Sequence, residues 1–168
     1  MSETKTHILE WLRDAHAMEQ QAEKTLIATN ERLQHYPDFK ARVELHLEET
    51  RGQARLLEQA IAARGGDTST LKDFAGRMAA RFQGVGAMMA EDEVVKLAIA
   101  AYHFEHLEIA SYQCLIAAAK ATGDADLAEI CHAILPQEQA MADWMSTQIP
   151  LITRDYLVRE QEGVESKR

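Results

Sequence analysis

The sequence predicts an all-α protein that folds as a four-helix bundle in a single domain. Along most of the chain, apolar residues recur in steps of three and four, which is the spacing of one helix face. The 168 residues include only three prolines and eight glycines, and they are rich in alanine, leucine and glutamate, which favour helix. This length is sufficient for one domain with a full hydrophobic core.

The first two helices are expected to form a hairpin that turns at Pro37. The first helix should span residues 5–34, and Pro37 cannot continue it, whereas Asp38 can cap the next helix. The second helix should then run to about Arg64, where two glycines stop it. The inward stripe of the first helix is Ile8, Leu12, Ala15, Glu19, Ala22, Leu26, Thr29 and Leu33. The inward stripe of the second is Phe39, Val43, His46, Glu49, Gln53, Leu56 and Ala60.

The next segment, residues 67–91, is expected to be a crossover that travels the length of the bundle. It should carry a short helix over residues 71–82, between a cluster of hydroxyl residues and two glycines. A third long helix should follow over residues 92–121, and Gly123 should end it. The inward residues expected on this helix are Ala98, Tyr102, Glu105, Ile109, Tyr112, Ile116 and Ala119.

The fourth helix is expected to close at Pro150 and to be disturbed earlier by Pro136. A proline inside a helix removes one backbone hydrogen bond, so Pro136 should kink this helix or split it, just before Glu138. The inward residues expected here are Leu127, Cys131, Ile134, Glu138, Met141, Met145 and Gln148.

The chain after Pro150 is expected to end in a short amphipathic helix over residues 151–160. The domain should then cover residues 1–162, with residues 163–168 as a frayed tail. Two helical hairpins joined by a long crossover form the ferritin-like bundle topology.

Acidic residues occupy positions where such a bundle should have apolar core. Glu19, Glu49, Glu105 and Glu138 each take an inward position on a different helix, at similar distances from the turns. Glu108 follows Glu105 by one helical turn. Because ionised carboxylates are almost never buried without a partner, a shared pair of metal ions is the best candidate. Divalent metals such as iron and manganese accept carboxylate oxygens, and a carboxylate can bridge two ions.

A nitrogen ligand is less certain from the sequence. His46 lies one turn before Glu49 and could bind metal, although a buried, hydrogen-bonded histidine is an equal alternative. In di-iron bundles, two helices each carry a Glu-x-x-His pair. Here Gly52 and Met141 stand at the two positions where those histidines are expected, which leaves the occupancy of a second metal open.

The residues around these acids resemble a known family. Ala17-Met18-Glu19-Gln20-Gln21, the stretch 46–50 and the stretch 105–112 are similar to the YciE/YciF family of bacterial ferritin-like proteins. The resemblance implies a cytoplasmic, stress-associated, often dimeric bundle that is related to rubrerythrins and named as a candidate ferroxidase. The rubrerythrin pattern also implies Glu-x-x-Glu on the third helix, which Glu105 and Glu108 match.

Composition limits the other partners. The 18 basic and 27 acidic residues give a net charge of −9, which argues against nucleic acid or an anionic membrane surface. No apolar run approaches the ~20 residues that span a bilayer, and no signal peptide is evident, so the expected location is the cytoplasm. Cys114 and Cys131 do not form a disulfide framework or a zinc motif, and we interpret them as two small buried thiols.

The sequence thus predicts a carboxylate-bridged dinuclear site, with iron, two ions per chain, as the expected metal. Manganese and zinc are alternatives. The expected chemistry is oxidation of Fe(II) by dioxygen or peroxide in a homodimer, with Glu49 and Glu138, or Glu19 and Glu105, bridging the metals. Two other hypotheses stay open: a metal-poor helical dimer that acts as a stress-linked structural or interaction module, and a bundle with a single structural metal.

Overall fold

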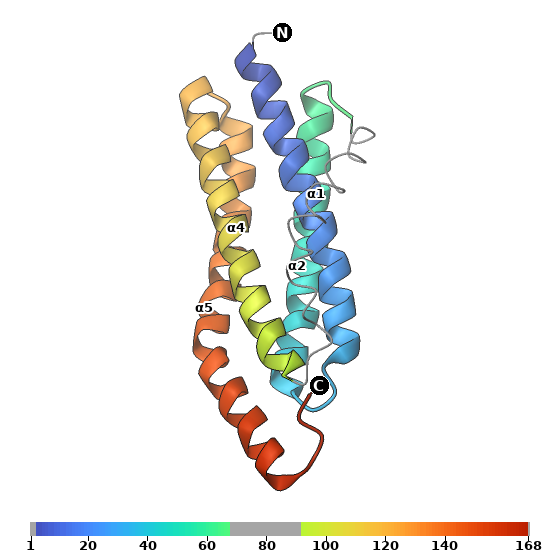
Figure 1. The fold of residues 1–168 in the computed structure, drawn as a ribbon. Helices are drawn as coiled ribbons and strands as arrows, with labels where there is room; N and C mark the ends of the chain where they lie inside the picture. The colour runs from blue at the N-terminus through green and yellow to red at the C-terminus, as the bar shows by residue number, and fades with distance from the viewer. Residues whose placement is uncertain (1–2, 68–91, 168) are drawn as a thin grey trace.

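A computed structural model describes residues 3–67 and 92–167 of the chain. Within these ranges it contains no strand, and its four long helices lie side by side as a bundle (Figure 1). The helices are α1 (Glu3–Arg32), α2 (Pro37–Ala63), α4 (Glu93–Thr122) and α5 (Ala125–Glu162). The predicted four-helix bundle is therefore confirmed. The short helix expected over residues 71–82, and most of the expected crossover, lie outside the described residues.

The helices pair as two antiparallel hairpins, α1 with α2 and α4 with α5 (Figure 1). The end of α2 and the start of α4 lie at opposite ends of the bundle, so α2 and α4 run in the same direction. As a result α1 contacts α4, and α2 contacts α5, in antiparallel pairs across the two hairpins. Each of the four helices can therefore direct one face into a common interior.

The turns contain the residues that the sequence singled out. Pro37 is the first residue of α2, where its missing N–H is not needed. Gly123 ends α4 with a φ of +70°, a left-handed conformation that glycine adopts without steric cost. The side chain of Asp124 then accepts a hydrogen bond from the backbone N–H of Leu127 at 3.1 Å, which caps α5. Arg64 at the end of α2 also pairs with Asp124 at 2.6 Å, so this cap joins the two hairpins.

The prolines of α5 do not divide it, because α5 continues through Pro136 and Pro150 to Glu162. The expectation that the helix closes at Pro150 is wrong, and residues 151–160 are helical as a continuation of α5. Figure 1 shows that α5 bends along its length. Met145 and Ile152 are buried on either side of Pro150, so tertiary packing holds the helix together there despite the lost backbone hydrogen bond.

At Ser166 and Lys167 the chain packs back onto the bundle, whereas the sequence predicted that residues 163–168 are frayed. The hydroxyl of Tyr36 donates a hydrogen bond to the carbonyl oxygen of Ser166 at 2.7 Å, and Ser166 is buried. The backbone N–H of Val94 donates to the carbonyl oxygen of Lys167 at 3.2 Å. The tail therefore covers the turn between α1 and α2 and the start of α4.

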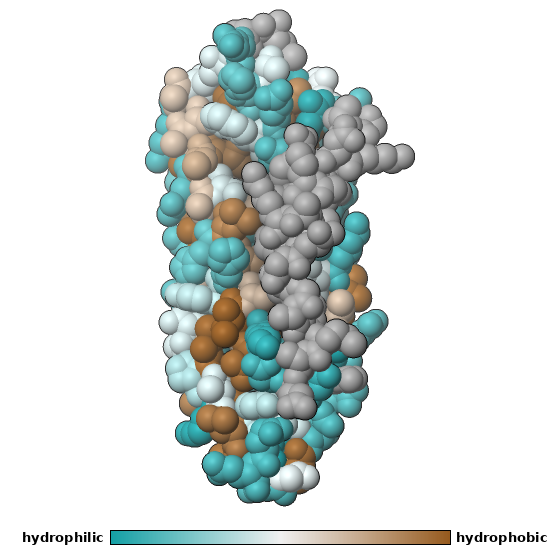
Figure 2. Space-filling view, in the orientation of Figure 1, coloured by the Kyte–Doolittle hydropathy of each residue, from teal (hydrophilic) through white to brown (hydrophobic). Residues whose placement is uncertain are grey.

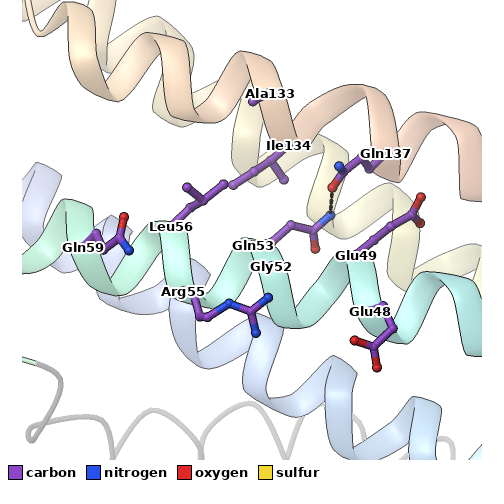
Figure 3. A pocket seen from close by; sticks show the side chains of 10 residues that line it. All are labelled: Glu48, Glu49, Gly52, Gln53, Arg55, Leu56, Gln59, Ala133, Ile134 and Gln137. Atoms are coloured by element: carbon purple, nitrogen blue, oxygen red, sulfur yellow. Dashed lines mark hydrogen bonds between the residues drawn. The ribbon is translucent and has the colours of Figure 1, made fainter.

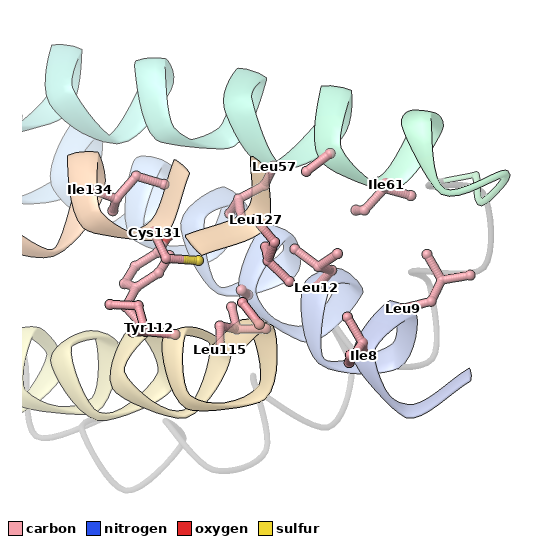
Figure 4. Close-up of a cluster of buried hydrophobic side chains, with 14 of the residues drawn as sticks. Ile8, Leu9, Leu12, Leu57, Ile61, Tyr112, Leu115, Leu127, Cys131 and Ile134 are labelled. Carbon is pink, nitrogen blue, oxygen red and sulfur yellow. The ribbon is translucent and has the colours of Figure 1, made fainter. Parts of the chain in front are cut away.

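The interior contains two apolar clusters, one towards each end of the bundle. One cluster, shown in part in Figure 4, includes Ile8, Leu12, Leu57, Ile61, Leu115, Leu127 and Ile134. The other includes Leu26, Leu33, Phe39, Val43, Val94, Met141, Met145 and Ile152. Between them, the inward positions of the helices carry glutamate and histidine, so a polar layer crosses the middle of an otherwise apolar core.

The outer surface is mainly hydrophilic on the face that Figure 2 shows. Figure 2 shows a mainly hydrophilic face on which apolar side chains gather in small groups. None of the helices in the described part of the chain is both long and apolar enough to span a membrane. Cys131 is buried as expected, but Cys114 is exposed, and both thiols are free.

Candidate metal centre

All four helices contribute to the polar layer between the two apolar clusters. We define this layer by five buried side chains, which are Glu19 of α1, His46 of α2, Glu105 and Glu108 of α4, and Glu138 of α5. Each lies on a helix face that also carries buried apolar residues, such as Val43 on α2 and Ile134 and Met141 on α5, and packing of those neighbours carries the polar group inward. The spacing of residues along each helix therefore places the polar side chains of the layer in the interior.

Four members of the polar layer lie close enough to share one ion. Ligand atoms of His46, Glu105, Glu108 and Glu138 all fall within 4.8 Å of one another. Nε2 of His46 is 3.2 Å from a carboxylate oxygen of Glu105 and 3.5 Å from one of Glu138. Glu19 is fully buried beside this group, and its charge interacts with Glu105 and His46. One nitrogen and several oxygens therefore converge from four helices.

The carboxylates of the polar layer have too few hydrogen-bond donors. Among the described residues, none donates in good geometry to five buried oxygens: both of Glu108 and Oε2 of Glu19, Glu105 and Glu138. The N–H at Nε2 of His46 faces two of these oxygens and cannot satisfy all five. Buried polar groups are normally paired, so this deficit requires either shared protons or a bound cation.

Burial changes the acidity of these groups. It raises the pKa of Glu19 to about 8, even though the hydroxyl of Tyr112 donates a hydrogen bond to its carboxylate. Burial, followed by the charges of the neighbouring carboxylates, also raises the pKa of Glu108 and of Glu138 well above the ordinary value. Without metal, the layer therefore holds protons at neutral pH, and a cation would displace them.

Three side chains outside the layer hold three of its members in place. Tyr112 donates its hydroxyl proton to Oε1 of Glu19, and Nε2 of Gln53 donates to Oε1 of Glu138. In both cases no described residue donates a hydrogen bond to the second oxygen, Oε2. Partners of this kind fix the orientation of metal ligands in proteins, and their loss weakens metal binding.

The third outer side chain is Glu49, which the sequence predicted as a ligand. Glu49 is 23% exposed, and its Oε2 lies 2.8 Å from Nδ1 of His46, on the other side of the ring from Glu105. The structure does not bring Glu49 into the group that could share one ion. Its carboxylate instead contacts His46 and Arg42, and the hydrogen bond with His46 lowers the pKa of Glu49.

His46 occupies the inward position between these acids. Burial alone would lower the pKa of His46, but its hydrogen bonds to Glu105 and Glu49 raise it to about 10. In the metal-free protein the imidazole is thus a cation that partly balances the carboxylates. As a metal ligand it would be neutral at Nε2, with the proton at Nδ1 held by Glu49.

The sequence missed one residue of this arrangement, Gln53, whose amide joins α2 to α5. Gln53 had been placed on the inward stripe of α2, seven residues after His46, but no role was assigned to it. The signal was available, because a buried glutamine next to a carboxylate needs a hydrogen-bond partner. The partner, Oε1 of Glu138, is on another helix, and sequence alone cannot pair the two.

The fold and the polar layer define a class, a four-helix bundle with a buried carboxylate and histidine cluster that could hold a metal ion. The chain belongs to the family described as Domain of unknown function (DUF892), whose model matches residues 3–158. This finding supports the family link that the sequence resemblance suggested.

Solved structures agree with this assignment. A protein from Xanthomonas campestris pv. campestris is 36% identical, with 95% of this chain and 99% of that chain covered and a TM-score of 0.80. YcfI from Rhodopseudomonas palustris, described as a candidate structural protein, is 27% identical over 88% of this chain and 98% of its own, with a TM-score of 0.72. The E. coli stress protein YciF is 23% identical over 89% of this chain and 96% of its own, with a TM-score of 0.76, and shares the fold.

Proposed function

We propose that the protein binds divalent transition metal in the polar layer and oxidises Fe(II) there with peroxide or dioxygen. The observation that carries this proposal is the set of five buried carboxylate oxygens for which the described part of the chain supplies no adequate donor. Oxygen-rich sites with a single histidine suit iron and manganese, and they also accept zinc. His46, Glu105, Glu108 and Glu138 could share an ion, and Glu19, which is buried beside them, would complete the set of ligands.

Charge balance supports two ions rather than one. When ionised, Glu19, Glu105, Glu108 and Glu138 carry four negative charges, which two divalent cations would neutralise. A single cation would leave two buried negative charges, and these are costly in an apolar interior. The absence of histidine at Gly52 and Met141 is partly offset by His46, which approaches from the preceding turn of α2.

The residues of the chain would support oxidation in three ways. The apolar clusters on either side exclude bulk water from the polar layer. Tyr112, Glu49 and Gln53 hold three ligands in fixed orientations. Carboxyl groups such as Glu19 release protons when Fe(II) binds. Peroxide would take one electron from each of two Fe(II) ions and two protons, and leave as water.

The wider biological setting also rests on the resemblance. A relation to ferritins and rubrerythrins would agree with two antiparallel hairpins, with Glu105-x-x-Glu108 on α4 and with a polar layer in mid-bundle. A cytoplasmic homodimer with a role in stress would agree with the YciE/YciF resemblance. An external electron donor would be needed for repeated turnover, because the chain has only two cysteines and no iron–sulfur motif.

An anaerobic Fe(II) titration of the metal-free protein tests the proposal. We expect about two irons per chain and, after peroxide is added, a ferric absorption band in the near ultraviolet. The double variant Glu105→Gln, Glu138→Gln should lose both, whereas Glu129→Gln on the exposed face of α5 should retain both. Iron binding that is equal in wild type and the double variant would exclude the polar layer as the site.

A second function has its own support, a helical module that works without metal. Nε2 of His46 lies beside Glu105 and Glu138, and Nδ1 beside Glu49, so a protonated histidine could hold the layer together by itself. The description of the R. palustris relative as a candidate structural protein agrees with this. In that case added metal should change neither the thermal midpoint nor the absorption spectrum.

A further inference from the structure

A groove on the outside of the bundle lies beside the polar layer, between α2 and α5. It has a volume of about 400 Å³, and Figure 3 shows the side chains that line it. On α2 these include Glu49, Gly52, Gln53 and Arg55, and on α5 they include Gln137. The groove thus opens on the side of the bundle where two of the outer side chains of the metal centre are found.

Gln53 is the connection between this groove and the ligands. Its Nε2 donates to Oε1 of Gln137 at 2.9 Å, as the dashed line in Figure 3 shows, and the same atom donates to Oε1 of Glu138. Gln53 is only 1% exposed, and its own Oε1 has no hydrogen-bond partner within residues 3–67 and 92–167. One uncharged side chain with an unused oxygen therefore stands between the groove and a buried ligand.

Glu49 also connects the groove to the polar layer, through His46. Its carboxylate is partly exposed, lines the groove and contacts Nδ1 of His46 at 2.8 Å. Glu48, one residue earlier, also lines the groove and is paired on the surface with Arg51. Arg55 is a basic residue that also lines the groove. Arg42 contacts the carboxylate of Glu49 at 3.2 Å. Glu49 is thus the acidic group that joins the groove to His46.

We propose that this groove is the route by which a divalent cation enters the metal centre, and this inference rests on the proposed function. Glu49 attracts the hydrated ion to the wall of the groove, which adds to the attraction of a chain with a net charge of −9. The amide of Gln53 then turns away from Glu138, and its free Oε1 binds the passing ion. The vacated Oε1 of Glu138 becomes available as the ion moves inward.

Gly52 keeps the groove open, because it lines the groove and has no side chain to fill it. Of the atoms in the described residues, a Cβ added at Gly52 would meet only Nη2 of Arg55, at 3.9 Å, which is an ordinary van der Waals contact. Replacement of a helical glycine by a better helix former adds up to ~1 kcal/mol of helix stability. A larger side chain at this position should therefore obstruct the groove without weakening the fold.

The test measures how fast Co²⁺ enters the metal-free protein, from its visible absorption in a stopped-flow instrument. We expect Gly52→Leu to slow uptake by roughly tenfold or more, with Gly52→Ala in between, while the final spectrum and stoichiometry stay unchanged. Release of Co²⁺ to a chelator should slow by the same factor, because a blocked route alters both directions equally. Ala41→Leu, on the exposed face of α2, is the matched control.

The outcomes separate this inference from the proposed function. Equal uptake rates in wild type, Gly52→Leu and Gly52→Ala would overturn the route while leaving the metal centre intact. A wild-type protein that binds no Co²⁺ would overturn the proposed metal centre itself, and the route with it. Slower uptake in Gly52→Leu with a reduced stoichiometry would indicate damage to the ligands, and it too would count against the route.

Discussion

Oε2 of Glu49 lies 2.8 Å from Nδ1 of His46, one turn further along α2, while Nε2 of the same ring faces Glu105 and Glu138. A carboxylate that accepts the Nδ1 proton fixes the orientation of an imidazole and increases its basicity at the other nitrogen. With a metal ion in the polar layer, Glu49 would therefore act on it through His46. This role differs from the direct ligation expected from the sequence.

The first prediction concerns Glu49→Gln. The amide oxygen can still accept from Nδ1, but it lacks the charge that holds the imidazole strongly, so His46 becomes a weaker ligand. We expect metal affinity to fall by about ten- to a hundredfold, with the number of ions per chain unchanged. Competition with a chelator of known affinity measures this change.

Glu48→Gln is the matched control for that prediction, because Glu48 is the adjacent acid and is exposed at the surface beside Arg51. It removes the same charge from the same helix without contact to His46, so its affinity should equal that of the wild type. If Glu49→Gln lost an entire ion, Glu49 would itself be a ligand and would not act through His46.

The second prediction is that Glu108→Gln stabilises the metal-free protein. Both carboxylate oxygens of Glu108 are buried and receive no hydrogen bond from any residue that the structure describes, and burial raises its pKa well above the ordinary value. The neutral isostere removes a group that is costly to bury, so the free energy of unfolding should rise by about 1–3 kcal/mol. Metal should then raise the thermal midpoint less than it does in wild type.

Circular dichroism melts with and without metal measure both parts of this prediction. Glu129→Gln removes a carboxylate from the exposed face of α5 and should leave both midpoints unchanged. A metal-free Glu108→Gln protein that melts below wild type would show that Glu108 already has a stabilising partner. A variant with the full metal-induced rise would show that Glu108 is not a ligand.

The helices and most of the buried residues could be predicted from the sequence. Apolar residues that recur every three or four positions indicate a helix and also identify the face that it buries. All eight residues of the expected stripe on α1, from Ile8 to Leu33, are buried. On α5, the stripe from Leu127 to Met145 is also correct. The continuity of α5 through Pro150 could not be predicted, since it depends on the packing of Ile152 against residues distant in sequence.

The candidate site was predicted less completely, and α2 shows the reason. After His46, the helix period allows either Glu49 or Thr50 to face inward, and the structure buries Thr50. The same alternation then buries Leu57 where Leu56 was expected. Whether the next inward residue comes three or four positions later depends on which side chains of the other helices pack against α2. The sequence alone does not show that packing.

The third prediction is that the metal-free protein becomes less stable as pH rises from about 5 to 9. The folded pKa of Glu19 is about 8 against an ordinary 4.5, and that of His46 is about 10 against 6.5. A raised folded pKa gives stability that is complete below the unfolded value and is lost as pH rises through the folded value. Glu19 thus loses its contribution between 4.5 and 8, and His46 between 6.5 and 10.

Metal should reverse this trend, because ligands bind it in their deprotonated forms and affinity therefore increases with pH. We expect the difference between the thermal midpoints with and without Co²⁺ to grow from pH 5 to pH 8. Thermal melts in buffers of equal ionic strength measure it. A metal-free protein whose midpoint rises over the same range would contradict a protonated polar layer.

The last prediction concerns Tyr112, whose hydroxyl donates to Glu19 from a fully buried position. Tyr112→Phe keeps the ring within the apolar cluster but leaves Oε1 of Glu19 without a donor. The free energy of unfolding should fall by about 1–3 kcal/mol at pH 8, measured by urea denaturation. Tyr102→Phe, at a half-buried position on the same helix, is the control and should change it little.

Metal binding gives a second measurement for Tyr112→Phe. Glu19 would no longer be held with Oε2 free, so affinity for Co²⁺ should also fall, while a merely structural loss of one hydroxyl would lower stability alone. Because Glu19 binds a proton more tightly without its donor, the pH at which Co²⁺ binding is half complete should move upward. An unchanged pH profile would show that Tyr112 does not position Glu19 for the metal.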